Sequence, residues 1–119
     1  MQAVWVEIPV EDLARAAAFY QAVFGLPAGE VNDDGTRRTV TLASPSAEGG
    51  VGISLNQTAG FLPSNKGPLV YLGTAGDALD RVEASGGKIL EGKTSMGDAG
   101  SYALILDSEG NQFALFFNA

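Results

Sequence analysis

A single carboxylate, Glu7, is the first candidate for chemistry in this sequence. It lies in the segment VWVEIPV (residues 4–10), where alternating residue types predict a strand that places Glu7 on the same face as Trp5. A carboxylate beside a large aromatic ring needs a partner, because burying it alone is costly. Glu7 could be a general base, bind a cationic or hydrogen-bonding ligand, or be one leg of an oxygen-rich metal site. It could equally form a structural ion pair with Arg37 or Arg38.

The composition restricts this chemistry further. The 119 residues include no His and no Cys, which removes disulfides, thiolate nucleophiles and the commonest metal ligand and general base. Fourteen acidic residues against seven basic ones give a formal net charge of −7. This balance argues against nucleic acid or an anionic membrane as a partner and is compatible with a cationic ligand.

The hydropathy pattern contains no apolar run near the roughly 20 residues of a membrane span. The first ten residues lack a basic segment and lead directly into the first predicted strand. We therefore expect no signal peptide and a cytoplasmic protein.

Two segments have the apolar spacing of a helix. In residues 12–25, Asp12 is a plausible N-cap and Gly25 a plausible C-terminal stop. In residues 74–87, Thr74 could serve as the cap. The apolar face of the first segment comprises Leu13, Ala17, Tyr20 and Phe24.

The two helical segments are part of a longer repeat. Gly25 and Gly87 lie 62 residues apart (87 − 25 = 62), and the same offset aligns strand-like segments and turns without a gap. We predict an α+β fold of two βαβββ modules in tandem, about residues 2–57 and 66–118, in a single domain 1–119.

Short polar segments connect the predicted strands. NDDGT (residues 32–36) has the residues of a hairpin turn, and PSAEG (45–49) and DSEGN (107–111) also read as turns. GGVG (49–52) precedes no helix, so a phosphate-binding loop is not expected there.

The first and last strands of the modules carry two contrasting faces. One face is uniformly apolar and is predicted to pack under the helices; it comprises Val6, Ile8, Val10, Val51, Ile53, Leu55, Pro68, Val70, Leu72, Phe113, Leu115 and Phe117. The other face mixes aromatic, small and polar residues, as a ligand pocket does. A subunit interface or a solvent-exposed face is the alternative. The candidate ligand-binding residues on the mixed face are Trp5, Glu7, Ser54, Leu69, Tyr71, Gln112 and Phe116.

The chain resembles the glyoxalase/bleomycin-resistance/dioxygenase superfamily, also called the vicinal oxygen chelate fold. The resemblance spans essentially the whole chain and is carried by EIPVEDLARAAAFYQAVFGL, VYL, DALDRVEASGGKIL and GSYALILDSEGNQFALF. It implies two modules curved into an incomplete barrel, a site in its concave inside, and a homodimer. Whether one chain completes that barrel, or two chains do so by domain swapping, stays open.

The resemblance also implies where the metal ligands of the enzymes in this superfamily would lie. In this sequence the positions fall on Trp5, Gly52, Gly67 or Pro68, and Ala114, and none of these has a ligating side chain. We therefore expect no metal and no other cofactor.

Three functions follow from these observations. The first is a metal-free protein that binds a small molecule, as the bleomycin-resistance branch sequesters a drug. The second is a lyase, isomerase or dioxygenase-like enzyme that uses Glu7 as its base, with no metal or an atypical one. The third is a protein–protein module.

The sequence makes a specific prediction about the pocket: Glu7 points into a cavity walled by Trp5 and Tyr71. Phe61 and Met96, on flanking loops, could close over a ligand. Tyr102 could add a further aromatic wall, although simple packing explains it as well.

Overall fold

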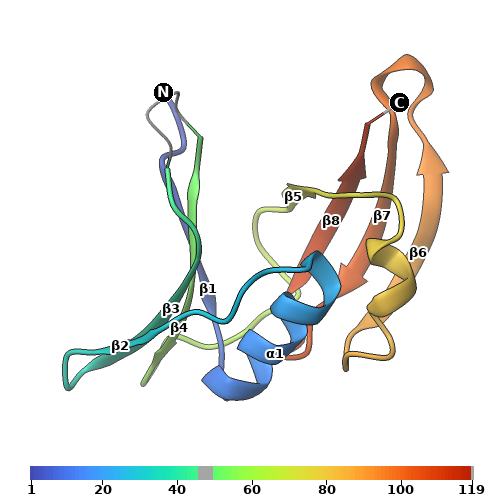
Figure 1. Cartoon of the computed structure of the whole chain (residues 1–119). Helices are drawn as coiled ribbons and strands as arrows, with labels where there is room; N and C mark the ends of the chain where they lie inside the picture. The colour runs from blue at the N-terminus through green and yellow to red at the C-terminus, as the bar shows by residue number, and fades with distance from the viewer. Residues whose placement is uncertain (46–49, 119) are drawn as a thin grey trace.

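The computed structural model describes residues 1–45 and 50–118, which form two four-stranded sheets and one long helix (Figure 1). In each sheet, the module's first and last strands pair in parallel and the other neighbours are antiparallel. The first sheet has the order β1 (Trp5–Pro9), β4 (Gly52–Thr58), β3 (Arg37–Ala43), β2 (Val31–Asp33). The second has the order β5 (Val70–Gly73), β8 (Gln112–Phe117), β7 (Ser101–Leu106), β6 (Lys88–Ser95). The predicted α+β fold of two βαβββ-like modules is confirmed.

The helix α1 (Leu13–Phe24) has the predicted ends. The side chain of Asp12 accepts a hydrogen bond from the backbone N–H of Arg15 at 3.0 Å. Gly25 ends the helix with a left-handed φ of 66°, which glycine adopts without steric cost. The buried face of the helix comprises Leu13, Ala16, Phe19, Tyr20 and Val23.

The prediction of a second long helix over residues 74–87 was wrong. The segment contains only a short 3-10 helix, η1 (Ala78–Arg81), and Asp77 in front of it makes no side-chain cap bond. Glycines flank this turn on both sides, and glycine disfavours a longer helix. The apolar spacing nevertheless identified the side chains that reach the core, because Ala78 and Val82 are fully buried.

The gap-free offset between the modules was also wrong in detail. Trp5 pairs with Gly52, 47 residues further on (52 − 5 = 47). Val70 pairs with Phe113, only 43 residues further on (113 − 70 = 43). The second module is therefore four residues shorter between its first and last strands.

One apolar core joins both sheets to α1. The helix lies between the diverging sheets, so each sheet has an inner face toward the core and an outer face away from it (Figure 1). The predicted apolar face is the inner face of both sheets; Ile8, Leu55, Leu72 and Leu115 are among its buried members. Val51 and Pro68 are exposed, since each precedes the strand to which it was assigned.

The polar turns are present where the structure describes them. In the hairpin between β2 and β3, Asp34 accepts hydrogen bonds from the N–H groups of Thr36 and Arg37 at 2.9 and 2.7 Å. Asp107 accepts two such bonds at 2.9 Å, from Glu109 and Asn111. The turn predicted at 45–49 lies almost entirely outside the described residues.

A single 3-10 turn, η2 (Gly97–Ala99), joins β6 to β7. Within residues 1–45 and 50–118, no helix is long and apolar enough to cross a membrane.

Candidate functional site

The outer face of the first sheet brings Trp5, Glu7 and Ser54 together. The parallel pairing of β1 with β4 sets Trp5 opposite Gly52 and Glu7 opposite Ser54. The indole N–H of Trp5 donates to Ser54 Oγ at 3.1 Å. A Cβ at Gly52 would lie 2.2 Å from Trp5 Cε3, so the indole ring covers this glycine. Trp5 therefore fills the space beside Gly52.

Glu7 lies at the centre of a polar network on this face. The Arg37 guanidinium donates to Glu7 Oε1, and the Asn56 amide donates to Oε2 at 3.0 Å. The Thr58 hydroxyl donates in turn to Asn56 Oδ1. The Glu7 side chain remains 37% exposed. Of the alternatives that the sequence left open, the structure contains the ion pair, and with Arg37.

Asn56 is a site residue that sequence reasoning missed, whereas Arg37 is one of the two partners that it named for Glu7. Asn56 lies two residues after Ser54, so the same alternation that selected Ser54 puts it on the same face. Arg37 and Arg38 are neighbours in β3 and therefore point to opposite faces. Arg38 lies on the inner side of the first sheet, with its Nε atom 3.6 Å from Asp33 Oδ2.

The outer face of the second sheet carries the remaining candidates. Tyr71 pairs with Ala114, and Gly73 pairs with Phe116. Tyr71 is 52% exposed, whereas Ala114 between the larger side chains is fully buried. Leu69 and Gln112 border a small hollow at the end of this face. The face is thus a partly exposed aromatic and apolar surface.

A carboxylate that the sequence did not single out, Glu91, completes this second outer face. The Tyr102 hydroxyl donates to Glu91 Oε2 at 2.6 Å, and the Thr94 hydroxyl donates to the same oxygen at 2.9 Å. These hydrogen bonds, first from Tyr102 and then from Thr94, lower the pKa of Glu91. The bond to Glu91 in turn raises the pKa of Tyr102. Plain strand alternation over β6 would not have placed Glu91 on this face, because the register shifts between Ile89 and Glu91.

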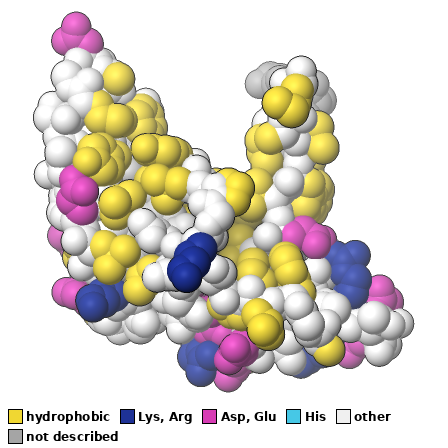
Figure 2. Space-filling model, turned by 180° about the vertical axis from the view of Figure 1, so that it is seen from behind, with side chains coloured by type: hydrophobic (Ala, Val, Ile, Leu, Met, Phe, Trp, Pro, Cys, Tyr) yellow, Lys and Arg dark blue, Asp and Glu magenta, His cyan; other side chains and the backbone are white. Residues whose placement is uncertain are grey.

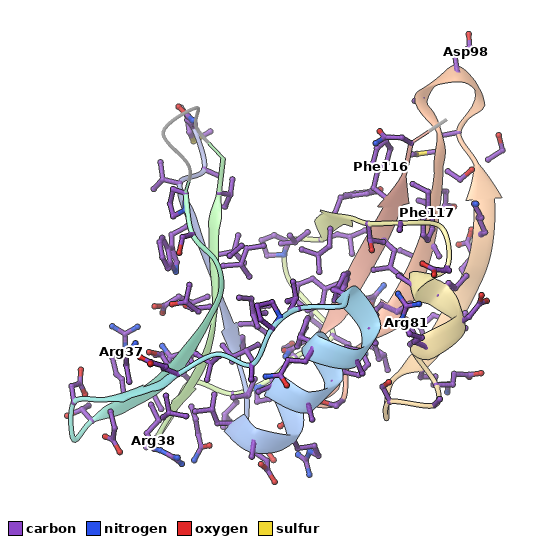
Figure 3. All side chains as sticks on the ribbon, in the orientation of Figure 1. Arg37, Arg38, Arg81, Asp98, Phe116 and Phe117 are labelled. Carbon is purple, nitrogen blue, oxygen red and sulfur yellow. The ribbon has the colours of Figure 1, made fainter. Side chains whose placement is uncertain are left out.

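The two outer faces do not meet within one chain. Both inner faces pack on the core that α1 shares, so the outer faces turn away from each other. Arg37 lies on the arm formed by the first sheet and Phe116 on the arm formed by the second (Figure 3). The predicted cavity walled by both Trp5 and Tyr71 is therefore absent from the described chain, and the two sheets of one chain do not close an incomplete barrel around a ligand.

Glu7 and Gln112 do approach the same space. A cavity of about 320 Å³ lies between β1 and the second sheet, and Phe61 also borders it. Met96 does not border this cavity; it precedes η2, whose Asp98 marks the tip of the β6–β7 hairpin (Figure 3).

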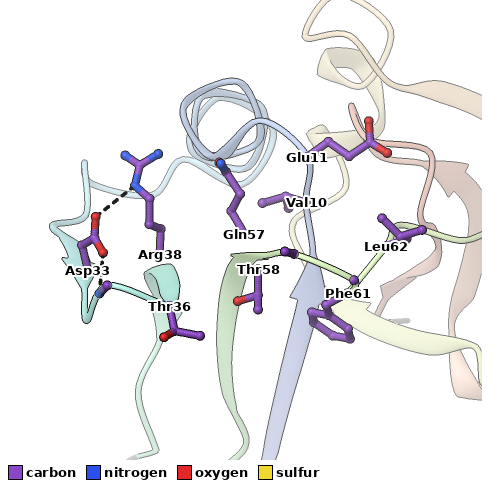
Figure 4. A pocket seen from close by; sticks show the side chains of 12 residues that line it. Val10, Glu11, Asp33, Thr36, Arg38, Gln57, Thr58, Phe61 and Leu62 are labelled. Atoms are coloured by element: carbon purple, nitrogen blue, oxygen red, sulfur yellow. Dashed lines mark hydrogen bonds and ion pairs between the residues drawn. The ribbon is translucent and has the colours of Figure 1, made fainter.

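Two further cavities lie away from these candidates. One, of about 420 Å³, fills the notch between the sheets, where hydrophobic side chains line both arms (Figure 2). Another, of about 590 Å³, lies beyond the end of the first sheet and is bordered by Asp33, Arg38, Gln57 and Phe61 (Figure 4). Of the seven candidate ligand-binding residues, only Tyr71 borders either of them.

The chain does not offer a metal site at the positions implied by the resemblance. Trp5 and Gly52 lie side by side, and Ala114 faces Tyr71 rather than Gly67, which precedes β5. None of these side chains is a metal donor. Within the described residues, no group of three or more Asp, Glu, His or Cys side chains could hold a metal ion.

Comparison with protein families gives one match that covers nearly all of this architecture. The family described as Glyoxalase/Bleomycin resistance protein/Dioxygenase superfamily matches residues 2–115. The chain belongs to this superfamily. Membership agrees with the paired modules, but it does not identify the ligand of this chain. A comparison with curated proteins finds no match.

Solved structures of the superfamily share the fold at low sequence identity. A glyoxalase/bleomycin resistance protein from Albidiferax ferrireducens is 21% identical with a TM-score of 0.71, and 98% of each chain is covered. A superfamily domain from Frankia sp. is 15% identical with a TM-score of 0.72, covering 100% of this chain and 98% of the other. A glyoxalase I mutant from Zea mays is 20% identical with a TM-score of 0.72, but only 46% of its chain is covered, against 97% of this one.

Proposed function

We propose that this superfamily member binds a small molecule on the outer faces of its sheets, without a metal or other cofactor. The observation that carries the proposal is the make-up of those faces. Trp5 and Tyr71 are 45% and 52% exposed and stand beside hydrogen-bonding side chains such as Ser54. Apolar walls with a few placed polar groups are typical of ligand sites. We also propose the cytoplasmic location that the sequence led us to expect.

The network around Glu7 favours binding over catalysis. A general base needs a carboxylate oxygen within reach of the substrate proton. Arg37 and Asn56 each occupy one oxygen of Glu7, so a substrate would have to displace one of them. This observation weakens the alternative of a lyase, isomerase or dioxygenase-like enzyme that uses Glu7 as its base.

The divergence of the outer faces supports a homodimer. A ligand on one sheet of a single chain would be covered from one side only. A second copy could set its second sheet against the first sheet of its partner, and so bring the Trp5 face to the Tyr71 face. We propose that the site is completed in this way, by symmetric pairing of two copies.

The proposal can be tested by mapping where small aromatic molecules bind. We expect quinoline, added to ¹⁵N-labelled protein at millimolar concentration, to shift the indole N–H signal of Trp5 and amide signals of β1 and β8. In Trp5→Ala, with the stacking surface removed, affinity should fall about tenfold, in line with the roughly 1–3 kcal/mol of an aromatic stacking contact. Val31→Ala, an exposed apolar residue on the inner side of β2, is the matched control.

Two outcomes would contradict the proposal. Shifts confined to the notch between the sheets, or no shifts at all, would remove ligand binding from the outer faces. Stoichiometric Zn, Ni, Mn or Fe in protein purified without chelator would overturn its metal-free part.

A further inference from the structure

The position of Glu91 on the second outer face follows from the strand register. Glu91 pairs with Leu104, which pairs with Ala114, and all three share a face with Tyr71. Tyr102 pairs with Phe116 one row further along. A half-buried carboxylate therefore stands on a surface rich in aromatic and apolar side chains.

Both hydroxyl groups that bind Glu91 use the same oxygen. Tyr102 and Thr94 donate to Oε2, and no hydrogen bond to Oε1 occurs within the described residues. The carboxylate is thus held in place on one side while its other oxygen is available. The carboxylate is ionised at neutral pH, as a glutamate with an ordinary pKa would also be, and the lowered pKa extends this to more acidic pH.

The charge of Glu91 is not balanced by a basic side chain in the described part of the chain. The nearest lysine in sequence, Lys93, lies over the ring of Phe117 on the inner face, 4.9 Å from its centroid. Lys88 is on the outer face and takes part in none of the ion pairs among the described residues. The ion pairs among the described residues are Arg15–Glu109, Arg37–Glu7, Arg38–Asp33 and Arg81–Asp77.

The first outer face differs in this respect. There the negative charge of Glu7 is matched by the guanidinium of Arg37. A positively charged ligand would gain little from an ion pair that is already formed. On the second face its positively charged group would meet an ionised carboxylate, and its apolar body could extend across the sheet toward Phe116 and Tyr71.

We infer that Glu91 binds the positively charged group of the ligand, with Tyr102 and Thr94 as its positioning residues. The ligand class is then an organic cation with an aromatic or apolar body. The inference rests on the proposed function and assigns cation recognition to Glu91 rather than to Glu7.

The test compares two probes of similar shape, N-methylquinolinium and quinoline, at pH 7.5, where quinoline is uncharged. Both are titrated into wild-type protein and followed by the amide shifts of β7 and β8. We expect Glu91→Gln to weaken binding of N-methylquinolinium about tenfold while leaving quinoline within about twofold. Glu83→Gln, at an exposed residue beyond η1, makes the same change in net charge and should alter neither affinity.

Two further variants separate recognition from packing. Tyr102→Phe should lower the affinity for the cation about threefold and leave quinoline unchanged, because it removes one bond that orients Glu91. In Glu7→Gln the ratio of the two affinities should stay as in wild type. If Glu91→Gln does not fold, the salt dependence of binding to wild-type protein provides the test. Rising NaCl should weaken the binding of N-methylquinolinium and not that of quinoline, and equal salt dependence of the two probes would contradict the inference.

The outcomes distinguish this inference from the proposed function. An unchanged ratio of affinities in Glu91→Gln, with both probes still on the outer faces, would overturn the role of Glu91 and leave the proposed function standing. Failure of both probes to shift any outer-face signal would overturn the proposed function and this inference with it.

Discussion

At the scale of single residues, Trp5 and Gly52 form a matched pair. The indole lies against the bare backbone of Gly52 and bonds to Ser54 at 3.1 Å. Trp5 is the sole tryptophan of the chain, so its emission reports on this one contact. The pair therefore gives a direct optical measure of the first outer face.

We predict that Gly52→Ala displaces the Trp5 ring, since the new Cβ would stand 2.2 Å from Cε3. Overpacking of this kind typically costs about 1–3 kcal/mol of unfolding free energy. Tryptophan emission should shift to the red, and the urea midpoint should fall. Gly92→Ala is the control, because a Cβ there meets nothing within 4 Å. Unchanged emission in Gly52→Ala would contradict the packing described.

Strand alternation predicted the face of Glu7 correctly, but not the identity of its partner. Arg37 and Arg38 are adjacent in sequence, so they lie on opposite faces of β3. Which of them shares the face of Glu7 depends on how β3 is aligned with β4. Strand ends are the least certain part of any sequence-based prediction. The same limit hid Glu91, whose strand contains two irregular steps that change the alternation.

At the scale of elements, Glu109 connects the turn of the second module to the beginning of α1. Its carboxylate accepts the N–H groups of Glu11 and Asp12 at 3.0 Å, and Arg15 donates to both of its oxygens. Partial burial alone would raise the pKa of Glu109. The hydrogen bonds from Arg15 and from the backbone outweigh that effect and lower the pKa to about 2.

This shift predicts how stability depends on pH. The folded-state pKa of about 2 lies below the ordinary value of 4.5, so Glu109 stabilises the fold fully above pH 4.5. The contribution is lost as the pH falls from 4.5 to about 2. Glu109→Gln should cost about 2 kcal/mol at pH 7, after allowance for the exposed Arg15, and progressively less below pH 4.5. Urea unfolding of both proteins from pH 7 to 2 measures this; parallel stability curves would refute it.

A second contact between the same turn and α1 is buried. The Tyr20 hydroxyl donates to Asp107 Oδ2 at 2.6 Å, and Asp107 is only 3% exposed. Tyr20→Phe should lower the unfolding free energy by about 1–3 kcal/mol, because a buried carboxylate loses a donor. Tyr71→Phe, at an exposed tyrosine, should change it by less than about 0.5 kcal/mol. Equal effects of the two substitutions in urea unfolding would argue against the buried bond.

At the scale of the whole molecule, the sequence predicted the modules but not their mutual orientation. The modules follow from local signals, such as the alternation in VWVEIPV and the Asp12 cap. Their orientation depends on how α1 packs between the sheets, with Tyr20 meeting Phe113 edge-on at 6.4 Å between ring centroids. Such a long-range contact leaves no periodic signal in the chain.

The divergent outer faces lead to a prediction about mass. Light scattering at micromolar concentration should give about 24.6 kDa, twice the 12.3 kDa of one chain (2 × 12.3 = 24.6). Exposed apolar side chains such as Leu69 on the outer faces would be covered in the pair. A mass of 12.3 kDa at this concentration would refute the dimer.

The turning of the two outer faces away from each other has a thermodynamic consequence. In the proposed pair, each ligand touches both copies, so ligand occupancy and self-association are linked by mass action. Diluting the protein should weaken the apparent affinity for ligand, and adding ligand should lower the concentration at which the copies separate. Two equivalent sites per pair would then fill together or empty together as the protein concentration changes, which a chain with an enclosed site of its own would not do.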